Sequence, residues 1–155
     1  SEFRAKAASR HHRHRTARLA HGYSTFLHRR DDHAMTKRYR DITRSISGSL
    51  AKLRPAIPDV TTAFSQMARA ALKDGALDKK TKELIALAIG VAVRCDGCIG
   101  FHVDALVKLG AKRAELEETL GMAIYMGGGP SLMTAADAIA AWEEFTAPAE
   151  TKPAG

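Results

Sequence analysis

The sequence contains only two cysteines, Cys95 and Cys98, and it has no long hydrophobic run. Two cysteines cannot form the dense disulfide framework of a small secreted domain, and a chain of 155 residues can bury a core without covalent links. The longest hydrophobic run, residues 84–93, is about half of the roughly 18 residues that a membrane span needs. The first thirty residues also lack the hydrophobic segment of a signal peptide. We therefore expect a cytoplasmic protein without a membrane span, in which the two cysteines are catalytic or bind a metal.

Aromatic residues are scarce as well, at 6% of the chain, although hydrophobic residues make up 45%. The hydrophobic residues are therefore mainly Ala, Leu, Ile, Met and Val, a composition typical of helix bundles. From Met35 onward the hydrophobic positions recur at helical spacing, and no useful stretch alternates as a strand does. The sequence predicts an all-α bundle of about six helices, over residues 39–53, 60–72, 79–93, a segment ending at 109, 114–126 and 131–145.

Several residues mark the predicted helix ends. Asp59 and Asp78 are expected to cap two helix N-termini, because their carboxylates accept hydrogen bonds from free amides. Gly110 is expected to end the helix before it, and the run Gly127–Pro130 to separate the last two helices. The helix at 79–93 is hydrophobic nearly all round, so we expect it to be buried. Together with an Ala- and Met-rich, small-residue surface on the last helix, this excess of hydrophobic surface favours a homo-oligomer.

Positive charge is concentrated at the start of the chain. Residues 1–34 carry +5 of the formal net charge of +7 and six of the seven histidines. The segment opens with Ser-Glu-Phe, as a cloning junction often does, and has no helical or strand period, so we expect a non-native or disordered leader. Without it, the remaining charge is too low to favour nucleic-acid binding. We expect one helical domain over residues 35–147, followed by a flexible tail at 148–155.

Both cysteines and the remaining histidine lie within eight residues, in the motif Cys95-x-x-Cys98-x3-His102. A cysteine at the start of a helix lies close to free amide groups and to the positive end of the helix dipole, and both stabilise the reactive thiolate. The spacing lets the two sulfurs form a disulfide, and it puts His102 one turn beyond Cys98 on the same helix face. A neutral imidazole there could take a proton from a thiol. The motif therefore predicts a dithiol redox site.

Glu83 joins this site through a predicted hairpin. If the chain turns near Arg94, the helix that carries Glu83 and the helix that carries His102 run antiparallel, and the two residues lie at the same level. A carboxylate beside the imidazole would fix its tautomer and raise its basicity. The alternative is a solvated Glu83 in the first turn of its helix, where it stabilises the helix N-terminus. The helical period alone favours neither.

Three other interpretations of these residues stay open. Cys95, Cys98, His102 and Glu83 could bind zinc, which takes four ligands, although structural zinc sites usually draw two pairs of ligands from separate elements. A non-catalytic redox sensor or stress-associated module could use the disulfide to change its oligomer packing. Two buried structural cysteines would have no redox role. Of the four interpretations we prefer the dithiol enzyme, with no bound metal or cofactor.

The combined spacing of the site residues is specific. The pattern Glu83-x11-Cys95-x-x-Cys98-x3-His102 is followed by Tyr-Met-Gly-Gly-Gly-Pro at 125–130 and by an Ala-rich helix. This pattern resembles the alkylhydroperoxidase AhpD core of the carboxymuconolactone decarboxylase superfamily, and the resemblance extends over about residues 58–145. It implies an all-α fold that assembles as trimers or hexamers. It also implies a thiol-dependent peroxidase that acts on a hydroperoxide and is reduced by a thiol or lipoyl-type donor.

The resemblance also implies a role for each residue. Cys98 would be the peroxidatic cysteine, which becomes a sulfenic acid, and Cys95 the resolving cysteine, which closes the disulfide. Glu83 and His102 would relay protons to the thiols. The decarboxylases of the superfamily act on a lactone without a C-x-x-C pair, so the intact pair argues against that alternative activity. AhpD has a histidine immediately before its second cysteine, whereas this sequence has Gly97, so the implied relay is one imidazole short.

Overall fold

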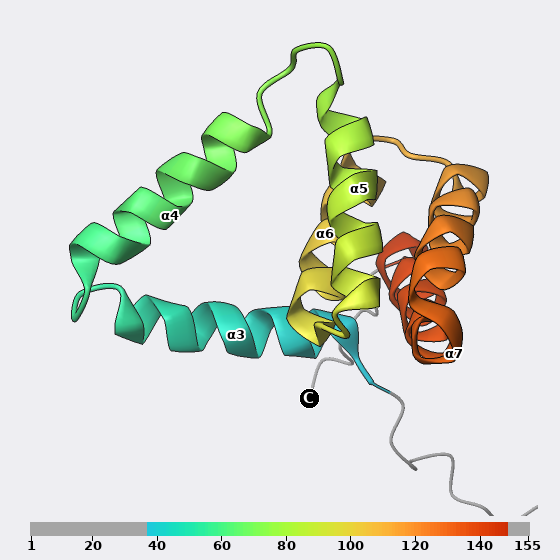
Figure 1. Cartoon of the computed structure of the whole chain (residues 1–155). Helices are drawn as coiled ribbons and strands as arrows, with labels where there is room; N and C mark the ends of the chain where they lie inside the picture. The colour runs from blue at the N-terminus through green and yellow to red at the C-terminus, as the bar shows by residue number, and fades with distance from the viewer. Residues whose placement is uncertain (1–36, 149–155) are drawn as a thin grey trace, which may run out of the picture. The chain divides into compact units, whose positions relative to one another are not determined.

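The computed structural model of the chain describes residues 37–148. The leader predicted at 1–34 and the tail beyond Pro148 lie outside the described residues. Every regular element in the described part is a helix, which confirms the all-α prediction (Figure 1). None of these helices is long and hydrophobic enough to span a membrane. They are α3 (Tyr39–Leu53), α4 (Pro58–Ala71), α5 (Lys79–Ala92), α6 (Asp96–Lys108) and α7 (Arg113–Thr146).

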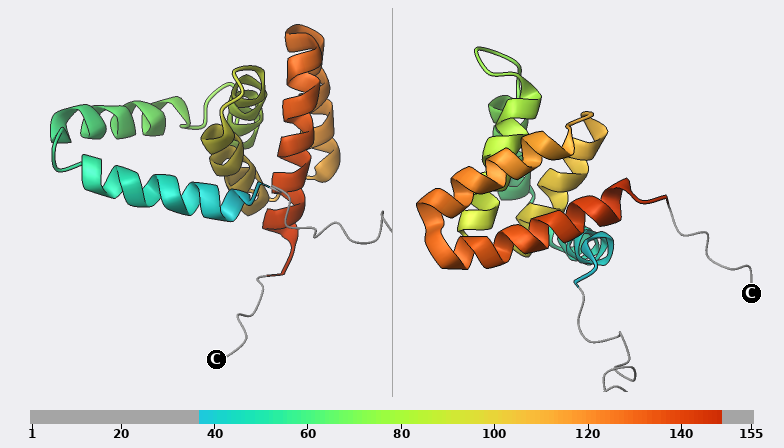
Figure 2. Two further views of the ribbon diagram at one scale, coloured as in Figure 1. Left: turned by 90° about the horizontal axis from the view of Figure 1, so that it is seen from below. Right: turned by 90° about the vertical axis from the view of Figure 1, so that its right-hand side faces the viewer.

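Helix α7 folds back on itself, so that its two arms run side by side (Figures 1 and 2). The reversal occurs at Gly128, whose φ of 66° and ψ of −153° belong to a region that is open almost only to glycine. Pro130 follows two residues later and lacks the N–H that a continuous helix would need. The predicted break at Gly127–Pro130 is therefore present, and the two arms correspond to the last two predicted helices.

The hydrophobic core lies between α5, α6 and the two arms of α7. Each helix turns one hydrophobic side inward, and Tyr39 from the first turn of α3 is fully buried among them. Ala135, Ala138 and Ala141 of the second arm of α7 belong to this core, whereas Leu132 and Met133 are exposed, so the predicted Ala- and Met-rich outer surface is present only in part. The other buried members are Leu87, Val91, Ile99, Val103, Leu106, Leu116, Leu120, Ala123 and Trp142.

Two of the three predicted helix-end residues are confirmed. Asp78 caps α5, and its carboxylate accepts a hydrogen bond of 2.7 Å from the backbone N–H of Thr81. Gly110 follows α6 with a φ of 70°, as predicted. The prediction that Asp59 caps α4 is wrong, because α4 begins two residues earlier than predicted, at Pro58, and its N-cap residue is Ile57. Proline suits the first helical position, since it has no N–H to leave unpaired and its φ is already helical.

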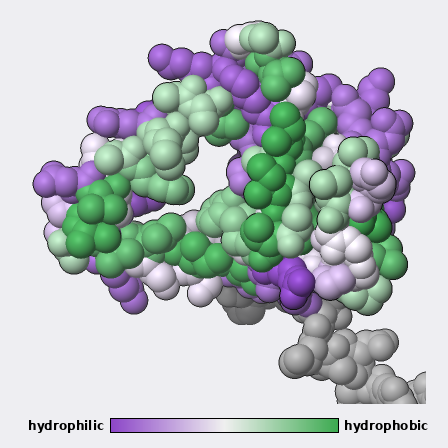
Figure 3. All heavy atoms as spheres, in the orientation of Figure 1, coloured by the Kyte–Doolittle hydropathy of each residue, from purple (hydrophilic) through white to green (hydrophobic). Residues whose placement is uncertain are grey.

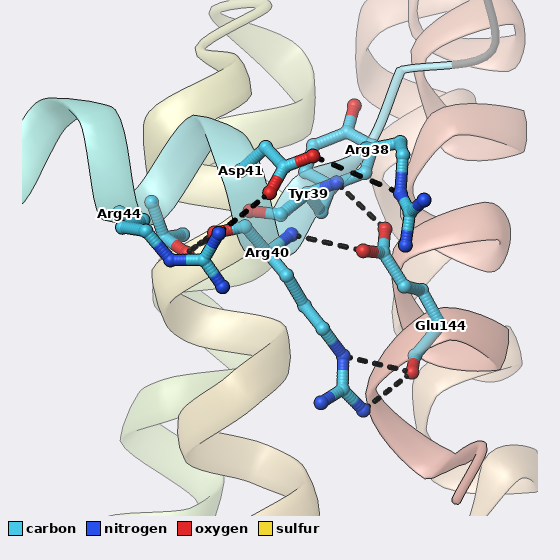
Figure 4. Close-up of polar contacts among 7 residues, drawn as sticks. Arg38, Tyr39, Arg40, Asp41, Arg44 and Glu144 are labelled. Atoms are coloured by element: carbon cyan, nitrogen blue, oxygen red, sulfur yellow. Dashed lines mark hydrogen bonds and ion pairs between the residues drawn. The ribbon is translucent and has the colours of Figure 1, made fainter. Parts of the chain in front are cut away.

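The N-terminus of α3 is attached to the second arm of α7 (Figure 4). The carboxylate of Glu144 accepts hydrogen bonds from the backbone N–H groups of Tyr39, at 2.6 Å, and Arg40, at 3.1 Å. The Arg40 guanidinium donates a hydrogen bond of 2.8 Å to the backbone carbonyl of Glu144, and it lies over the Phe145 ring. A side chain from the far end of the domain thus caps α3 and holds its first turn in place.

Helix α4 and one side of α5 have no partner among the described residues. No helix in residues 37–148 packs against α4, and none of the residues of α4 is buried. Helix α5 buries Leu87 and Val91 but exposes Ile85, Ile89 and Val93. The prediction that α5 is buried nearly all round is therefore wrong for the single chain.

Candidate functional site

The two cysteines are joined by a disulfide at the start of α6, with their Cα atoms 5.2 Å apart. Cys95 is the N-cap residue of α6, and its Sγ accepts a hydrogen bond of 3.2 Å from the backbone N–H of Cys98. This amide and the positive end of the helix dipole would stabilise a thiolate on Cys95 once the disulfide is reduced. The C-x-x-C motif thus lies at a helix start, as the sequence predicts.

A tight turn joins α5 to this motif. Arg94 has a φ of 59°, and the backbone N–H of Cys95 donates a hydrogen bond of 3.0 Å to the carbonyl of Gly90. Gly90 also lets the two helices meet closely, because a Cβ atom at this position would lie 3.1 Å from the Cβ of Cys98. The turn and the close approach together fold α5 and α6 into the predicted antiparallel hairpin (Figure 1).

Glu83 and His102 lie opposite each other on this hairpin. The Oε2 atom of Glu83 is 2.7 Å from Nδ1 of His102, and Glu83 is only 3% exposed. This burial excludes the alternative of a solvated Glu83. An ionised carboxylate only accepts hydrogen bonds, so the contact assigns the ring proton to Nδ1 and leaves Nε2 of His102 as an acceptor.

The remaining ring nitrogen can serve the thiols. His102 follows Cys98 by one turn of α6, and 29% of the surface of its side chain is exposed. Nε2 of this partly exposed side chain can exchange a proton with a thiol or with a bound water, while Glu83 holds the ring. The hairpin therefore brings together a pair of cysteines that can open and close a disulfide and a carboxylate–imidazole pair that can move a proton.

The zinc-binding interpretation has a geometric test. Cys95, Cys98, His102 and Glu83 all lie in the described part of the chain, and they do not form a set that could hold one metal ion. More generally, no three His, Cys, Asp or Glu side chains within residues 37–148 are arranged in that way. Both sulfurs are engaged in the disulfide, whereas a metal would need them as thiolates.

Comparison with known proteins identifies the family. The profile of the carboxymuconolactone decarboxylase family matches residues 58–141, from the start of α4 into the second arm of α7. This chain belongs to the carboxymuconolactone decarboxylase family. The resemblance drawn from the spacing of the site residues is confirmed at this level.

Solved structures of other family members share the fold. The apo form of a carboxymuconolactone decarboxylase family protein from Legionella pneumophila is 62% identical to this chain, with a TM-score of 0.69. The match covers 70% of this chain and 97% of the Legionella chain. A Thermotoga maritima member, described as having a possible part in an antioxidative response, is 30% identical over 66% of this chain and 87% of its own, with a TM-score of 0.60. An uncharacterised Cupriavidus necator protein is 38% identical over 71% of this chain and 94% of its own length.

Four residues that are linked by hydrogen bonds at the C-x-x-C motif were missed by the sequence analysis. Asp96 lies inside the C-x-x-C motif, and its Oδ1 accepts a hydrogen bond of 2.8 Å from Nζ of Lys37 and a long one of 3.4 Å from the Tyr39 hydroxyl. Lys37 also donates a hydrogen bond of 2.8 Å to Oδ2 of Asp137 on α7. These contacts join positions far apart in the sequence, so no helical period predicts them. The only signal was a charged residue between the two cysteines.

Gly97, at the position where AhpD has a histidine, lies against α3. A Cβ atom at Gly97 would come within 2.8 Å of the Cδ1 atom of Ile46. The end of the Ile46 side chain on α3 therefore occupies the space into which a larger residue at this position would extend. The absence of a side chain at Gly97 lets Ile46 of α3 pack close to the C-x-x-C motif.

Proposed function

We propose that this protein is a thiol-dependent peroxidase that reduces hydroperoxides through the Cys95–Cys98 pair. The observation that carries the proposal is a disulfide-forming pair at a helix start, on the same hairpin as the buried Glu83–His102 contact. The resemblance to the AhpD core supports Cys98 as the peroxidatic residue. The possible antioxidative part of the Thermotoga maritima relative agrees with such a reaction.

The oxidative half of the cycle uses both sulfurs. The Cys98 thiolate attacks the peroxide and breaks the O–O bond, so that sulfur takes the terminal hydroxyl as a sulfenic acid and an alkoxide leaves. The alkoxide takes a proton and becomes an alcohol. Cys95 then attacks the sulfenic sulfur, which forms the disulfide and releases water. His102 Nε2 accepts the thiol proton at the first step and can return it to the leaving oxygen.

The reductive half needs an external dithiol or lipoyl-type donor. The Cys98 amide stabilises a thiolate on Cys95, so Cys95 is the better leaving group and the donor attacks Sγ of Cys98. The second thiol of the donor then attacks the mixed disulfide, which frees Cys98 and leaves the donor oxidised. Two electrons and two protons have returned to the pair.

Thiol titration tests the assignment without a steady-state assay. The reduced protein should lose both of its thiols when an equimolar amount of peroxide is added. Cys95→Ser should convert its single thiol to a sulfenic acid that dimedone traps, and Cys98→Ser should keep its thiol. Equal reactivity of the two single variants would remove the assignment of Cys98.

A second candidate, a redox-sensing module, is favoured by the contact between α3 and the motif. Helix α3 touches Gly97 through Ile46 and continues into α4, which packs on no helix of the described part. Opening or closing the disulfide could thus shift α3 and, through it, the position of α4. For a sensor, the reduced and oxidised proteins would differ in oligomeric state, and peroxide would be consumed only once per chain.

We also propose that the protein is a homo-oligomer in which a second copy covers α4 and the exposed side of α5. Helices of about fourteen residues are marginal in water unless tertiary contacts support them, and α4 has none in the described chain. Its exposed hydrophobic side chains, Val60, Phe64 and Met67, recur at helical spacing. The face is therefore suited to another helix.

The chain itself supplies a matching surface for that helix. Figure 3 shows an opening bounded by α3, α4 and α5, with strongly hydrophobic residues along α5 at its edge. The exposed stripe of α5 consists of Ile85, Ile89 and Val93, again at helical spacing. Two copies related by a twofold axis could place the α4 stripe of each against the α5 stripe of the other.

A further inference from the structure

The residue inside the C-x-x-C motif is held by the start of α3. Asp96 is the first residue of α6, and its carboxylate receives the Lys37 ammonium at 2.8 Å and the Tyr39 hydroxyl at 3.4 Å. Lys37 also reaches Asp137 at 2.8 Å, so one ammonium joins the motif to α7. Tyr39 is fully buried and its backbone is bound by Glu144, which fixes this end of α3.

The backbone of the motif is also packed tightly against α3. A Cβ atom at Gly100 would lie 2.7 Å from Cγ2 of Thr43 and 3.3 Å from Cδ1 of Tyr39. The corresponding atom at Gly97 would lie 2.8 Å from Cδ1 of Ile46. The start of α6 therefore packs against side chains of α3 at Gly97 and at Gly100. The Lys37–Asp96 ion pair lies beside this packed helix start, with 43% of the Lys37 side chain and 41% of the Asp96 side chain exposed.

The charges of Asp96 and Lys37 have opposite effects on the ionisation of the two thiols. The Asp96 carboxylate competes with a thiolate for the free amides and the positive end of α6, so it disfavours thiolate formation. The Lys37 ammonium offsets that charge and favours the thiolate. Hydrogen bonds from Lys37 to Asp137 and Asp96 raise the pKa of Lys37, so it stays positive at neutral pH. Burial, followed by the Asp137 and Asp96 charges, raises the pKa of Tyr39, so this hydroxyl stays neutral.

We propose that Asp96 is a positioning residue of the redox motif and that Lys37 sets the ionisation of the two thiols by offsetting its charge. The proposal deepens the proposed peroxidase function, since the thiolate is the form that attacks the peroxide. The other charged groups near the cysteines are Glu83 on α5, Arg94 on the turn, His102 on α6 and Asp137 on α7. Asp96 differs from these in lying between the two cysteines, and Lys37 in its hydrogen bond to the Asp96 carboxylate.

The test is a pair of neutralising substitutions with opposite expected signs. In the reduced protein, the lower apparent pKa of the coupled thiols is read from the ultraviolet absorbance of the thiolate against pH. Lys37→Met should raise this pKa and Asp96→Asn should lower it, each changing the thiolate-to-thiol ratio about twofold to fivefold, as expected for a partly exposed ion pair. The double variant should return close to the unsubstituted protein, because both charges are then gone.

Two controls separate electrostatics from loss of structure. Lys80→Met removes an ammonium of similar exposure, which binds Glu115 at 2.7 Å at the opposite end of α5, and it should leave the thiol pKa unchanged. Tyr39→Phe removes only a neutral hydroxyl and should shift the pKa less than either charge substitution.

The result that overturns the proposal is a shift of the same sign in Lys37→Met and Asp96→Asn, or no shift in either. A loosened helix start would move both variants together, since each loses the same contact. The measurement contains no peroxide, so it remains decisive even if the protein turns out not to reduce hydroperoxides. The experiment can therefore contradict the proposed role of Lys37 and Asp96 without contradicting the peroxidase function, and the reverse.

Discussion

The carboxylate of Glu83 lies 2.7 Å from Nδ1 of His102, although the two residues are 19 positions apart and belong to different helices. The contact arises because α5 and α6 form an antiparallel hairpin around the turn at Arg94, and Glu83 faces the inside of that hairpin. A buried carboxylate that accepts the Nδ1 proton holds His102 in one tautomer, with Nε2 free to act. His102 of this pair follows Cys98 by one turn of α6.

Substitution of this pair should slow thiol oxidation. Glu83→Gln keeps the shape but loses the charge, and His102→Ala removes the base, so each should reduce the rate by roughly 10²–10⁴. Because less thiolate forms at a given pH, the rise of the rate with pH should move to higher pH. Stopped-flow oxidation of the reduced protein across a pH series checks both effects. A pH–rate profile that matches the unsubstituted protein would exclude the pair from the mechanism.

A histidine can be introduced at Gly97, where AhpD has one, to test whether a second imidazole speeds thiol oxidation. Gly97→His alone should destabilise the protein, because its side chain meets Cδ1 of Ile46. Gly97→His combined with Ile46→Ala opens the space and should recover the free energy of unfolding relative to Gly97→His. The double variant should also oxidise roughly tenfold faster than Ile46→Ala alone, since a second imidazole can share the proton transfer. Equal rates in these two variants would show that the relay is complete without it.

Much of the hairpin could be predicted from the sequence because its determinants are local. Asp78 and Gly110 have side-chain or backbone properties that mark helix ends, and the distance of Glu83 and His102 from the turn fixes their level on the two helices. Asp59 was misread since a neighbouring proline fits the first helical position and moved the start of α4. These are properties of a few consecutive residues.

The parts that could not be predicted depend on distant contacts. Glu144 caps α3 from 105 residues away, and Lys37 reaches Asp96 across 59 residues, so neither contact leaves a local pattern. The exposure of Ile85 and Ile89 was missed for a different reason. A helix that is hydrophobic nearly all round predicts burial, but the sequence does not say whether the same chain or another copy buries it.

The reversal within α7 makes a prediction about stability. Gly128→Ala should lower the free energy of unfolding by about 1–3 kcal/mol, because a side chain strains the backbone at a φ of 66° and ψ of −153°. Gly129→Ala is the matched control, since a Cβ atom there meets nothing within 4 Å and its φ is not positive. Urea denaturation of the two variants measures the difference. Equal midpoints would show that Gly128 is not needed for the reversal.

The hydrophobic face of α4 makes a prediction about assembly. Phe64→Glu introduces a charge on the exposed stripe, where the native side chain is 64% exposed in the single chain, and should shift the protein from oligomer to monomer. Ile89→Glu should do the same on the α5 stripe. Gln66→Glu adds the same charge to the other side of α4 and should leave the oligomer intact. Light scattering coupled to size exclusion decides, and a monomeric unsubstituted protein with a stable fold contradicts the proposal.

The most direct measurement of the central claim is steady-state consumption of an organic hydroperoxide in the presence of dithiothreitol or a lipoyl dithiol. The unsubstituted protein should consume many equivalents of peroxide per chain, with oxidised donor formed in equal amount. Cys98→Ser should consume no more than the donor alone. Turnover by Cys98→Ser at the rate of the unsubstituted protein, or no turnover by either, would contradict a peroxidase cycle through the Cys95–Cys98 disulfide.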